Sequence, residues 1–410
     1  MSPSKPLTPI ADFLRQLSEH ALASKPSLTT EWIELSAALG RVLAMDVDAT
    51  CNIPPLNNSA MDGYACAHAD WGVGQSMKVS ATCYAGQAPQ VLQHGTVMRI
   101  FTGAPIPQGA DTVVMQENVQ VLPNGLVQLQ HAPQLGENIR LAGQDVAKGQ
   151  RVVVQGTRLD AAELGVLASV GQAQLCVYTP LKVSVIATGD ELVSAGQPLA
   201  VGQIYNSNSP VLVALLQRLG CDVVQVTHLP DDPSQLRAGL LQAAASSDVV
   251  LTTGGASVGD ADHLKSVLAE IGQISHWKVA IKPGKPVVWG QIGQGQSATA
   301  LLGLPGNPQS VWVTFLVLVL PYLKQRQGQT QAVTPLSVRV PAGFERKKAQ
   351  ARCEYLRVQL QQGQLVAHPN QSSGVLSSAA WADGFAVIDT NETVSLGQFV
   401  QFIPFAGLLN

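Results

Sequence analysis

Charged side chains are scarce in this sequence. Asp, Glu, Lys and Arg together make up 13% of the residues and hydrophobic residues 46%, whereas a typical soluble chain is roughly a quarter charged. This composition predicts large buried cores. The formal net charge is −3, so the chain offers no broad basic surface and nucleic acid is not expected as a partner.

The cysteines form no metal or disulfide pattern. They are scattered, with no C-x-x-C pair and no histidine at the spacing of a zinc site. We therefore expect free thiols, buried or without a role, as in a reducing cytoplasm. The six are Cys51, Cys66, Cys83, Cys176, Cys221 and Cys353.

Long hydrophobic runs are absent as well. The most apolar stretch, VWVTFLVLVLPYL at residues 311–323, contains Pro321 and is shorter than the roughly 20 residues that span a bilayer. A buried core helix is predicted instead. The N-terminus lacks a basic head followed by an apolar stretch, which argues against a secretory signal. We expect a cytoplasmic protein with no membrane segment.

The residue pattern changes along the 410-residue chain, which is too long for one ordinary domain. Residues 8–24, 29–44 and 157–170 have helical spacing of apolar residues. Residues 51–141 are short β-type pieces with a hairpin signal at Asn124-Gly125, typical of a small separate β domain. From 181, strands and helices alternate, which predicts a three-layer α/β unit with a mostly parallel sheet. After about residue 330 the pattern is again β-like, as in a small barrel or sandwich.

Acidic side chains follow three of the predicted strands of the α/β unit. In an open parallel sheet, ligands bind beyond the carboxyl ends of the strands, so these acids are expected to crowd at one edge. Crowded carboxylates repel one another, and a divalent cation such as Mg²⁺ relieves the repulsion. The alternative is that each acid caps a helix or faces solvent. The acids are Asp190, Glu191, Asp231, Asp232, Asp260 and Asp262.

Three turns are suited to anions. TTGGASVGD, at 252–260, is neither G-x-G-x-x-G nor a Walker A sequence, but its glycines let backbone N–H groups face a phosphate. KPGKP carries Lys282 and Lys285 on a rigid turn, and LPGNPQS leads into a predicted helix with Ser310 in its first turn. Solvated surface turns are the alternative. The residues point to a phosphate-bearing substrate, a divalent cation and a second small anion, which they do not identify.

Seven segments then resemble, in order, the molybdopterin molybdenumtransferases, the MoeA-type enzymes related to the gephyrin E domain. The resemblance covers nearly the whole chain. It implies that adenylylated molybdopterin and molybdate react, assisted by Mg²⁺, to release AMP and molybdenum cofactor. The segments are NNSAMDGYA, RIFTGAPIPQGADTVVMQE, GENIRLAGQD, ATGDEL, TTGGASVGDAD, KPGKP and GLPGNPQS.

The same resemblance implies a multidomain α/β plus β architecture in an elongated homodimer. A helical linker domain is interrupted by an inserted β domain and is followed by a three-layer α/β molybdopterin-binding domain and a C-terminal β barrel. Active sites are expected between the α/β domain of one subunit and the inserted domain of the other. Expected partners are the upstream molybdopterin adenylyltransferase and molybdoenzyme-maturation proteins. The expected ranges are 1–50 with 142–180, 51–141, 181–328 and 329–410.

The site residues are carried over on these motifs. The resemblance implies catalytic roles for Asp62, Thr102, Asp145, Glu191, Asp231, Asp262, Lys278 and Lys282, with Glu191 and Asp262 on the metal. It implies binding of molybdopterin and molybdate by Gly254, Gly255, Ser257, Lys282, Lys285, Pro286, Pro305, Ser310, Arg352 and Ser373. The family often has Gly-Arg-x-Glu-Phe where this chain has Ala351-Arg352-Cys353-Glu354-Tyr355, so the chain departs at Ala351 and Tyr355 and keeps the arginine and the glutamate. It also departs at His263, where an aromatic residue is common.

Two other functions are compatible with parts of the sequence. A nucleotide hydrolase of the competence-damage type explains the double glycine but not SAMDGY or the KPGKP and LPGNP pair. A non-enzymatic scaffold is a further alternative, because gephyrin relatives cluster receptors. The chain has no long linker or fused synthase-like domain of the kind that would favour this reading.

Overall fold

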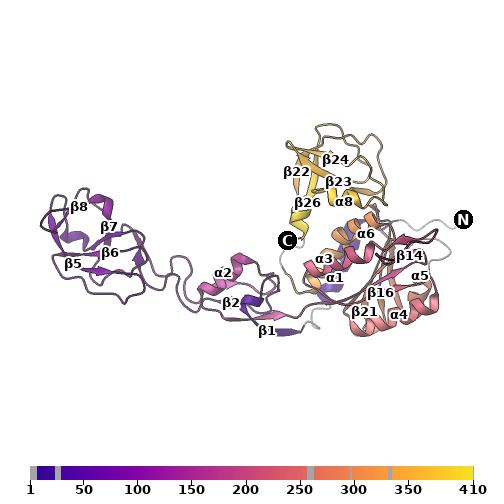
Figure 1. Cartoon of the computed structure of the whole chain (residues 1–410), viewed down its shortest axis with the longest axis horizontal. Helices are drawn as coiled ribbons and strands as arrows, with labels where there is room; N and C mark the ends of the chain where they lie inside the picture. Colours follow the sequence, from indigo (N-terminus) through magenta and orange to yellow (C-terminus); the bar gives the residue numbers. More distant parts are fainter. Residues whose placement is uncertain (1–6, 24–28, 256–262, 296–297, 331–334, 410) are drawn as a thin grey trace.

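The computed structural model describes residues 7–23, 29–255, 263–295, 298–330 and 335–409. The molecule is elongated. Figure 1 shows a β domain at one end, a narrow middle section, and an α/β unit with a second β domain at the other end.

The α/β unit is built on a six-stranded sheet with the order β16-β13-β17-β21-β20-β18. The first four strands are parallel, β20 runs antiparallel to β21, and β18 runs antiparallel to β20, which confirms a mostly parallel sheet. Helices on both faces complete the three layers. The strands are β13 (Lys182–Thr188), β16 (Asp222–Leu229), β17 (Val249–Thr253), β18 (Gly272–Lys278), β20 (Pro286–Ile292) and β21 (Thr299–Leu304).

Each face of this sheet has its own hydrophobic core. On one face, α4 (Pro233–Ser246) and α5 (Leu264–Ile271) pack through leucines such as Leu240 and Leu268. The opposite face is covered by α1 (Ile10–Ala23), α3 (Asn208–Arg218) and the segment 308–326. A short parallel ribbon, β14 (Leu192–Val193) with β15 (Ile204–Tyr205), follows β13.

The apolar run at 311–323 is a core helix, as predicted. It comprises α6 (Pro308–Thr314), a π-helical segment η6 (Phe315–Val319) and α7 (Leu320–Arg326). Within the described part of the chain, no helix is long and apolar enough to cross a membrane.

The first helix lies in a different place from the one expected. The apolar face of α1, with Phe13 and Leu17, is buried in the core of the α/β unit. The range 1–50 therefore does not form one helical domain with 142–180.

The helix predicted over 29–44 is also wrong. Thr30–Glu34 forms β1, which pairs with β12 (Gln174–Tyr178), and Leu35–Ala37 is a short 3-10 turn. Residues of β1 alternate between exposed and half-buried, the period of a strand on a sheet surface. This middle section also contains β2 (Val47–Asp48), β11 (Arg151–Val153) and α2 (Ala161–Ser169). Asp160 caps α2 as predicted, in a capping box with Glu163.

The inserted domain carries a six-stranded sheet with the order β7-β4-β6-β5-β9-β8 and a core on each side. The predicted hairpin is present: β8 and β9 are antiparallel, with Gly125 at φ 80°. The strands are β3 (Asn58–Ser59), β4 (Gly63–Cys66), β5 (Ser76–Cys83), β6 (Thr96–Ile100), β7 (Thr112–Met115), β8 (Val119–Val121), β9 (Val127–Leu129) and β10 (Ile139–Arg140), with short 3-10 turns at His68–Asp70 and Gln116–Asn118.

The C-terminal domain is a barrel. Its strands run in the order β19-β23-β25-β26-β22, β24 pairs with β23, and a bridge from Ala342 to Leu365 closes the ring. One strand, β19, comes from the α/β unit, and the core of that unit continues into the barrel through Tyr355 and Phe385. The elements are β19 (Ile281–Lys282), β22 (Val338–Pro341), β23 (Cys353–Gln361), β24 (Gln364–Ala367), α8 (Ser377–Trp381), β25 (Gly384–Ile388), β26 (Phe399–Pro404) and α9 (Phe405–Leu409).

All six cysteines are free thiols, as expected, and five are buried. Burial raises the pKa of Cys66 and of Cys353 to about 12. These thiols are therefore poor nucleophiles and poor metal ligands at neutral pH.

Candidate functional site

Three parallel strands end side by side in the α/β unit. β13 lies between β16 and β17, so the residues that follow them, Glu191, Asp231 and Gly254, meet at one edge. The backbone N–H of Asp231 donates to Asp190 Oδ1 at 3.1 Å. Burial, followed by the charges of Asp190 and Glu191, raises the pKa of Asp231. The acids thus repel one another, as the sequence suggested.

Not every predicted acid belongs to this cluster. Asp232 is the N-cap of α4 and accepts hydrogen bonds from Gln235 N at 2.8 Å and from the Ser234 hydroxyl. These bonds lower its pKa. For Asp232 the helix-cap alternative is correct, while Asp260 and Asp262 lie outside the described residues.

The carboxylate of Glu191 lies against Gly189, in the turn that follows β13. Gly189 has φ 144°, and a Cβ atom there would lie 2.6 Å from Glu191 Oε2. The carbonyl oxygen of Gly189 contacts His228 Nε2 at 2.8 Å. His228 thereby links the turn after β13 to the neighbouring strand β16.

The glycine turn after β17 lies against the end of β13. A Cβ atom at Gly254 would overlap the carbonyl oxygen of Thr188, and Gly254 and Gly255 both have positive φ, 88° and 59°. Only glycine fits this approach without strain. The Thr188 hydroxyl is buried and has no hydrogen-bond partner among the residues that the structure describes. Ser257, the third binding residue predicted here, lies outside the described residues.

A buried asparagine that the sequence analysis missed fixes this edge. Asn208 Nδ2 donates to Thr253 Oγ1 at 2.9 Å and to the Gly306 carbonyl at 2.7 Å, and Thr253 Oγ1 donates to the Pro305 carbonyl at 3.0 Å. These bonds hold the LPGNP turn beside the glycine turn. The available signal is the pair of asparagines in NSNSP, residues 206–210, just before a predicted helix.

The KPGKP turn lies where α6 meets the barrel. Gly284 has φ 113°, and a Cβ atom there would overlap the Thr314 side chain of α6. Lys282 extends into β19 and pairs with the barrel strand β23. Lys285 is exposed, while Lys278 and Pro286 are half-buried and pair with each other across β18 and β20.

A cavity of about 290 Å³ opens beside Lys282, lined by both the KPGKP turn and the barrel. Lys282 Nζ is paired with Glu354, and Arg346 Nε lies 3.6 Å from the second oxygen of the same carboxylate. Arg357, a third cation, also lines the cavity. Three cations thus face one buried carboxylate, a balance that favours a small anion. Arg346, Glu354 and Arg357 were not predicted as site residues.

Arg357 is fully buried at 1% exposure. Its guanidinium donates to Ser378 Oγ and to the Ser372 carbonyl, each at 3.2 Å. Burial, with a contribution from Arg346, lowers its pKa to about 10, so it is charged at neutral pH. Arg357 therefore supplies positive charge and fastens the loop that carries Ser373.

The predicted anion-binding residues from the barrel have different contacts. The Ser373 carbonyl accepts the N–H of Gln309 at 3.0 Å, so one N–H group at the start of α6 is occupied by the barrel loop. Arg352 donates to the Ile281 carbonyl at 3.4 Å, which puts it beside Lys282. Ser310 is buried at 3% exposure.

In the inserted domain, Asp62 and Thr102 are in contact. Asp62 Oδ1 accepts from Thr102 N and Thr102 Oγ1, both at 2.8 Å. These bonds, aided by Arg99, lower the pKa of Asp62. Asp145 is exposed on the connection to the middle section. Figure 1 shows the inserted domain far from the α/β unit, so one chain does not bring Asp62 and Glu191 together.

The residues at the strand ends suit a hard cation that also uses substrate oxygens. Among the residues that the structure describes, no three His, Cys, Asp or Glu side chains come together in a way that could hold a metal ion. Mg²⁺ commonly takes only one or two carboxylates plus substrate phosphates. The repelled carboxyl group of Asp231 and its acidic neighbours fit that requirement.

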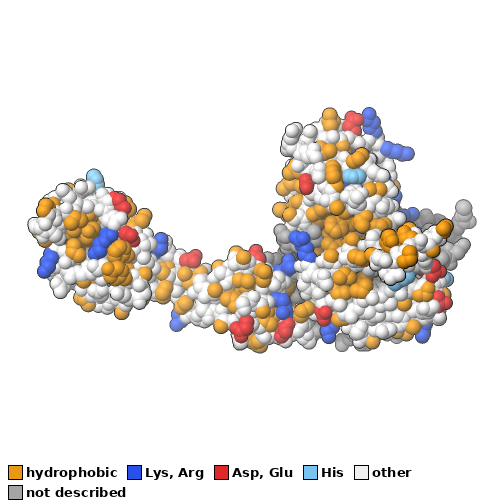
Figure 2. Space-filling model, in the orientation of Figure 1, with side chains coloured by type: hydrophobic (Ala, Val, Ile, Leu, Met, Phe, Trp, Pro, Cys, Tyr) orange, Lys and Arg blue, Asp and Glu red, His pale blue; other side chains and the backbone are white. Residues whose placement is uncertain are grey.

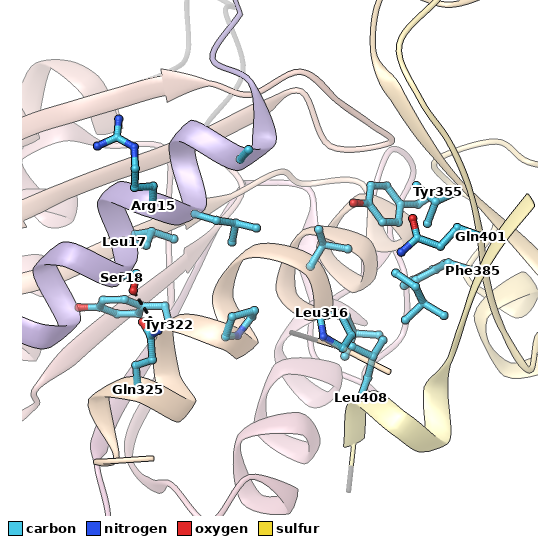
Figure 3. A pocket seen from close by; sticks show the side chains of 17 residues that line it. Arg15, Leu17, Ser18, Leu316, Tyr322, Gln325, Tyr355, Phe385, Gln401 and Leu408 are labelled. Atoms are coloured by element: carbon cyan, nitrogen blue, oxygen red, sulfur yellow. Dashed lines mark hydrogen bonds between the residues drawn. The ribbon is translucent and has the colours of Figure 1, made fainter. Parts of the chain in front are cut away.

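A larger cavity, of about 450 Å³, lies elsewhere. Figure 3 shows it between α1, the segment 316–325 and the barrel, with Gln325 donating to Ser18 at 2.9 Å. Its lining is mostly apolar and contains none of the predicted site residues. Hydrophobic side chains also gather on the surface where barrel and α/β unit meet (Figure 2). Such a cavity does not suit a charged substrate.

Three segments of the chain match models of protein families. Residues 8–171 match the family described as MoeA N-terminal region (domain I and II). Residues 184–325 match the probable molybdopterin binding domain, and residues 339–405 match the MoeA C-terminal region (domain IV).

Individual relatives match over most of the chain. The chain is 38% identical to the molybdopterin molybdenumtransferase of Haemophilus influenzae, covering 93% of this chain and 95% of the relative. It is 31% identical to gephyrin of Dictyostelium discoideum, covering 78% of this chain and 50% of gephyrin. A crystal structure of a molybdopterin biosynthesis MoeA protein from Pyrococcus horikosii is 30% identical and superposes with a TM-score of 0.77, covering 98% and 99% of the two chains.

Proposed function

This chain belongs to the molybdopterin molybdenumtransferase family, and we propose that it inserts molybdenum from molybdate into adenylylated molybdopterin with hydrolytic release of AMP. This is a transferase reaction that yields molybdenum cofactor.

One structural relationship carries the proposal. Helix α6 lies between the edge of the sheet that carries the glycine turn and the cavity beside Lys282. The turn before α6 abuts the glycine turn, since a Cβ atom at Gly306 would lie 3.7 Å from Gly254 Cα. Its second turn packs against Gly284 of KPGKP, next to the cavity at Lys282. A substrate phosphate and a separate oxyanion would thus bind on either side of α6. The proposed reaction uses both anions, the adenylylated substrate and molybdate.

The residues divide by chemistry. Gly254, Gly255 and the Pro305 turn would hold the phosphate end of the substrate, with Lys278 nearby. The cavity would hold molybdate through Lys282, which lines it together with Arg346 and Arg357. The other predicted molybdate residues would act from outside this lining; they are Lys285, Pro286, Ser310, Arg352 and Ser373. Charge-assisted hydrogen bonds from such cations contribute roughly 1.5–3 kcal/mol each. The proposal is supported by the excess of cations over carboxylates at the cavity.

Glu191 and Asp262 would hold Mg²⁺, and Asp231 would stand beside them. Bound there, Mg²⁺ would supply charge neutralisation for the phosphate that leaves as AMP. Burial and, after it, the charges of Asp190 and Glu191 raise the pKa of Asp231, and a cation at this edge would offset both effects. Glu191, folded over Gly189, keeps one carboxylate at the turn.

We further propose a homodimer with composite sites. Asp62, Thr102 and Asp145 would act at the α/β edge of a second chain, because the elongated chain keeps them from its own (Figure 1). The protein would work in the cytoplasm, receive its substrate from the molybdopterin adenylyltransferase and pass the product to molybdoenzyme-maturation proteins.

Molybdate-dependent AMP release from adenylylated molybdopterin tests the function. The purified protein is expected to release AMP with molybdate present and to activate an apo-molybdoenzyme with the product. A nucleotide hydrolase would release AMP equally well without molybdate, and a scaffold would release none.

A further inference from the structure

A stack of flat groups leads from the interior of the inserted domain to its surface. The Arg99 guanidinium lies over the rings of Tyr64 and Phe101, with Cζ 5.1 and 4.9 Å from their centroids. Phe101 in turn stacks on Tyr84, with centroids 5.1 Å apart and planes 13° apart. These distances are typical of cation–π and offset aromatic pairs.

The inner members of the stack are held by the sheet. Tyr64 is 8% exposed and faces Arg99 across β4 and β6. Arg99 donates to the Gly63 carbonyl at 3.1 Å and to Gln116 Oε1 at 2.6 Å. Because the guanidinium contacts two rings and donates hydrogen bonds from two of its nitrogens, it is committed to the protein and orients Phe101.

The outermost ring is open. Tyr84 is 50% exposed although one of its faces lies on Phe101. Because the ring is already oriented, little conformational entropy is lost when a second flat group stacks on it. Exposed aromatic rings of this kind are the usual platforms for nucleobases.

The platform is connected to Asp62 through the backbone at Phe101 and Thr102. Phe101 is adjacent to Thr102, whose N–H and hydroxyl both donate to Asp62 Oδ1. Neither bond uses Asp62 Oδ2, so that oxygen can accept from an N–H group of a ligand. Heteroaromatic rings with N–H groups on their edges combine both requirements.

We propose that Tyr84, oriented by Phe101 and Arg99, is a stacking platform for a fused heteroaromatic ring of the substrate. The proposal rests on the proposed function, in which the inserted domain faces the α/β edge of a second chain. Adenylylated molybdopterin carries two such rings, the adenine and the pterin, which share this chemistry. Tyr84 is a positioning residue, because it holds a ring remote from the reacting phosphate and metal.

The test compares Tyr84→Leu, which removes the flat face, with Tyr84→Phe, which keeps it. In the full-length protein, Tyr84→Leu is expected to raise the KM for adenylylated molybdopterin about tenfold, the usual scale for loss of one stacked base, with kcat unchanged. Tyr84→Phe is expected to behave as wild type. Phe399→Ala, which removes a ring that is 55% exposed on the barrel, serves as the control and should change neither constant.

Binding without turnover separates the two rings and isolates the platform from the proposed reaction. Calorimetric Kd values are measured for AMP and for neopterin, a soluble pterin, with wild type and Tyr84→Leu. The probe whose affinity falls about tenfold identifies the ring. Equal Kd values in both proteins, or no binding of either probe to wild type, would overturn the platform even where AMP release proceeds. Failure of AMP release in the presence of Tyr84-dependent binding would instead refute the proposed reaction.

Discussion

Lys282 Nζ is paired with the carboxylate of Glu354, a side chain that is only 5% exposed. Arg346 lies on the other oxygen of the same carboxylate. The cavity beside them therefore contains its own anion before any substrate arrives. An oxyanion bound there would compete with Glu354 for these cations, and under the proposed function this competition would set how much molybdate the enzyme requires.

Glu354→Gln is expected to lower the molybdate concentration for half-maximal AMP release by roughly three- to tenfold, because the amide keeps the shape and removes the competing charge. Initial rates across a molybdate titration measure this. Glu345→Gln breaks an exposed pair with Lys347 in the same domain and should leave the titration unchanged. A higher molybdate requirement in Glu354→Gln would show that the carboxylate assists binding.

Two adjacent acids are expected to affect stability with opposite signs. Asp231 has a raised pKa, so its contribution to the free energy of unfolding falls as pH rises through the range above 3.8. Asp231→Asn should therefore stabilise the protein at pH 7. Asp232 has a lowered pKa, so its contribution is present at neutral pH and is lost as pH falls below 3.8. Asp232→Asn should not stabilise at pH 7. Urea unfolding at pH 7 and at low pH compares them, and equal shifts in both variants would contradict the assignment.

The half-buried His20 of α1 predicts acid sensitivity. Burial, aided by Arg326, lowers the pKa of His20 from 6.5 to about 4, so the folded protein binds fewer protons than the unfolded chain between these values. The free energy of unfolding should fall as pH drops from 6.5 towards 4. His20→Gln should be less stable at pH 7 but should lack this part of the pH dependence. An unchanged slope in the variant would assign the sensitivity to other groups.

Gly254→Ala tests the contact between the glycine turn and β13. A Cβ atom there overlaps the Thr188 carbonyl as well as requiring positive φ, so we expect a loss of about 3 kcal/mol or more in the free energy of unfolding. Gly74→Ala is the matched control, since φ is 82° and nothing lies within 4 Å of the added atom. It should cost about 1 kcal/mol. Equal losses would mean that the overlap is relieved by a small backbone shift.

The sequence predicted those features that follow from local pattern. The acids and glycines after the strands are predictable because β13 and β17 are largely apolar and buried, and because β16 has a clear end at Leu229. Residues 29–44 were mistaken for a helix because apolar residues in that stretch satisfy the helical period, while pairing with β12, more than a hundred residues away, decides for a strand.

Contacts between distant segments were not predictable from one sequence. Asn208 bonds to Thr253 and Gly306, and no local spacing relates these positions. Arg357 lies on a β-strand and would ordinarily be assigned to a solvated face. Its burial follows from the loop at Ser372 that closes over it, which only the tertiary structure reveals.

Mixing two inactive variants tests the central claim most directly. Asp62→Ala and Glu191→Ala chains are unfolded and refolded together, and molybdate-dependent AMP release is measured after heterodimers have been confirmed. If each active site combines Asp62 of one chain with Glu191 of the other, a heterodimer contains one intact site, and an equal mixture should recover about a quarter of wild-type activity. Confirmed heterodimers that release no more AMP than either variant alone would contradict the composite site.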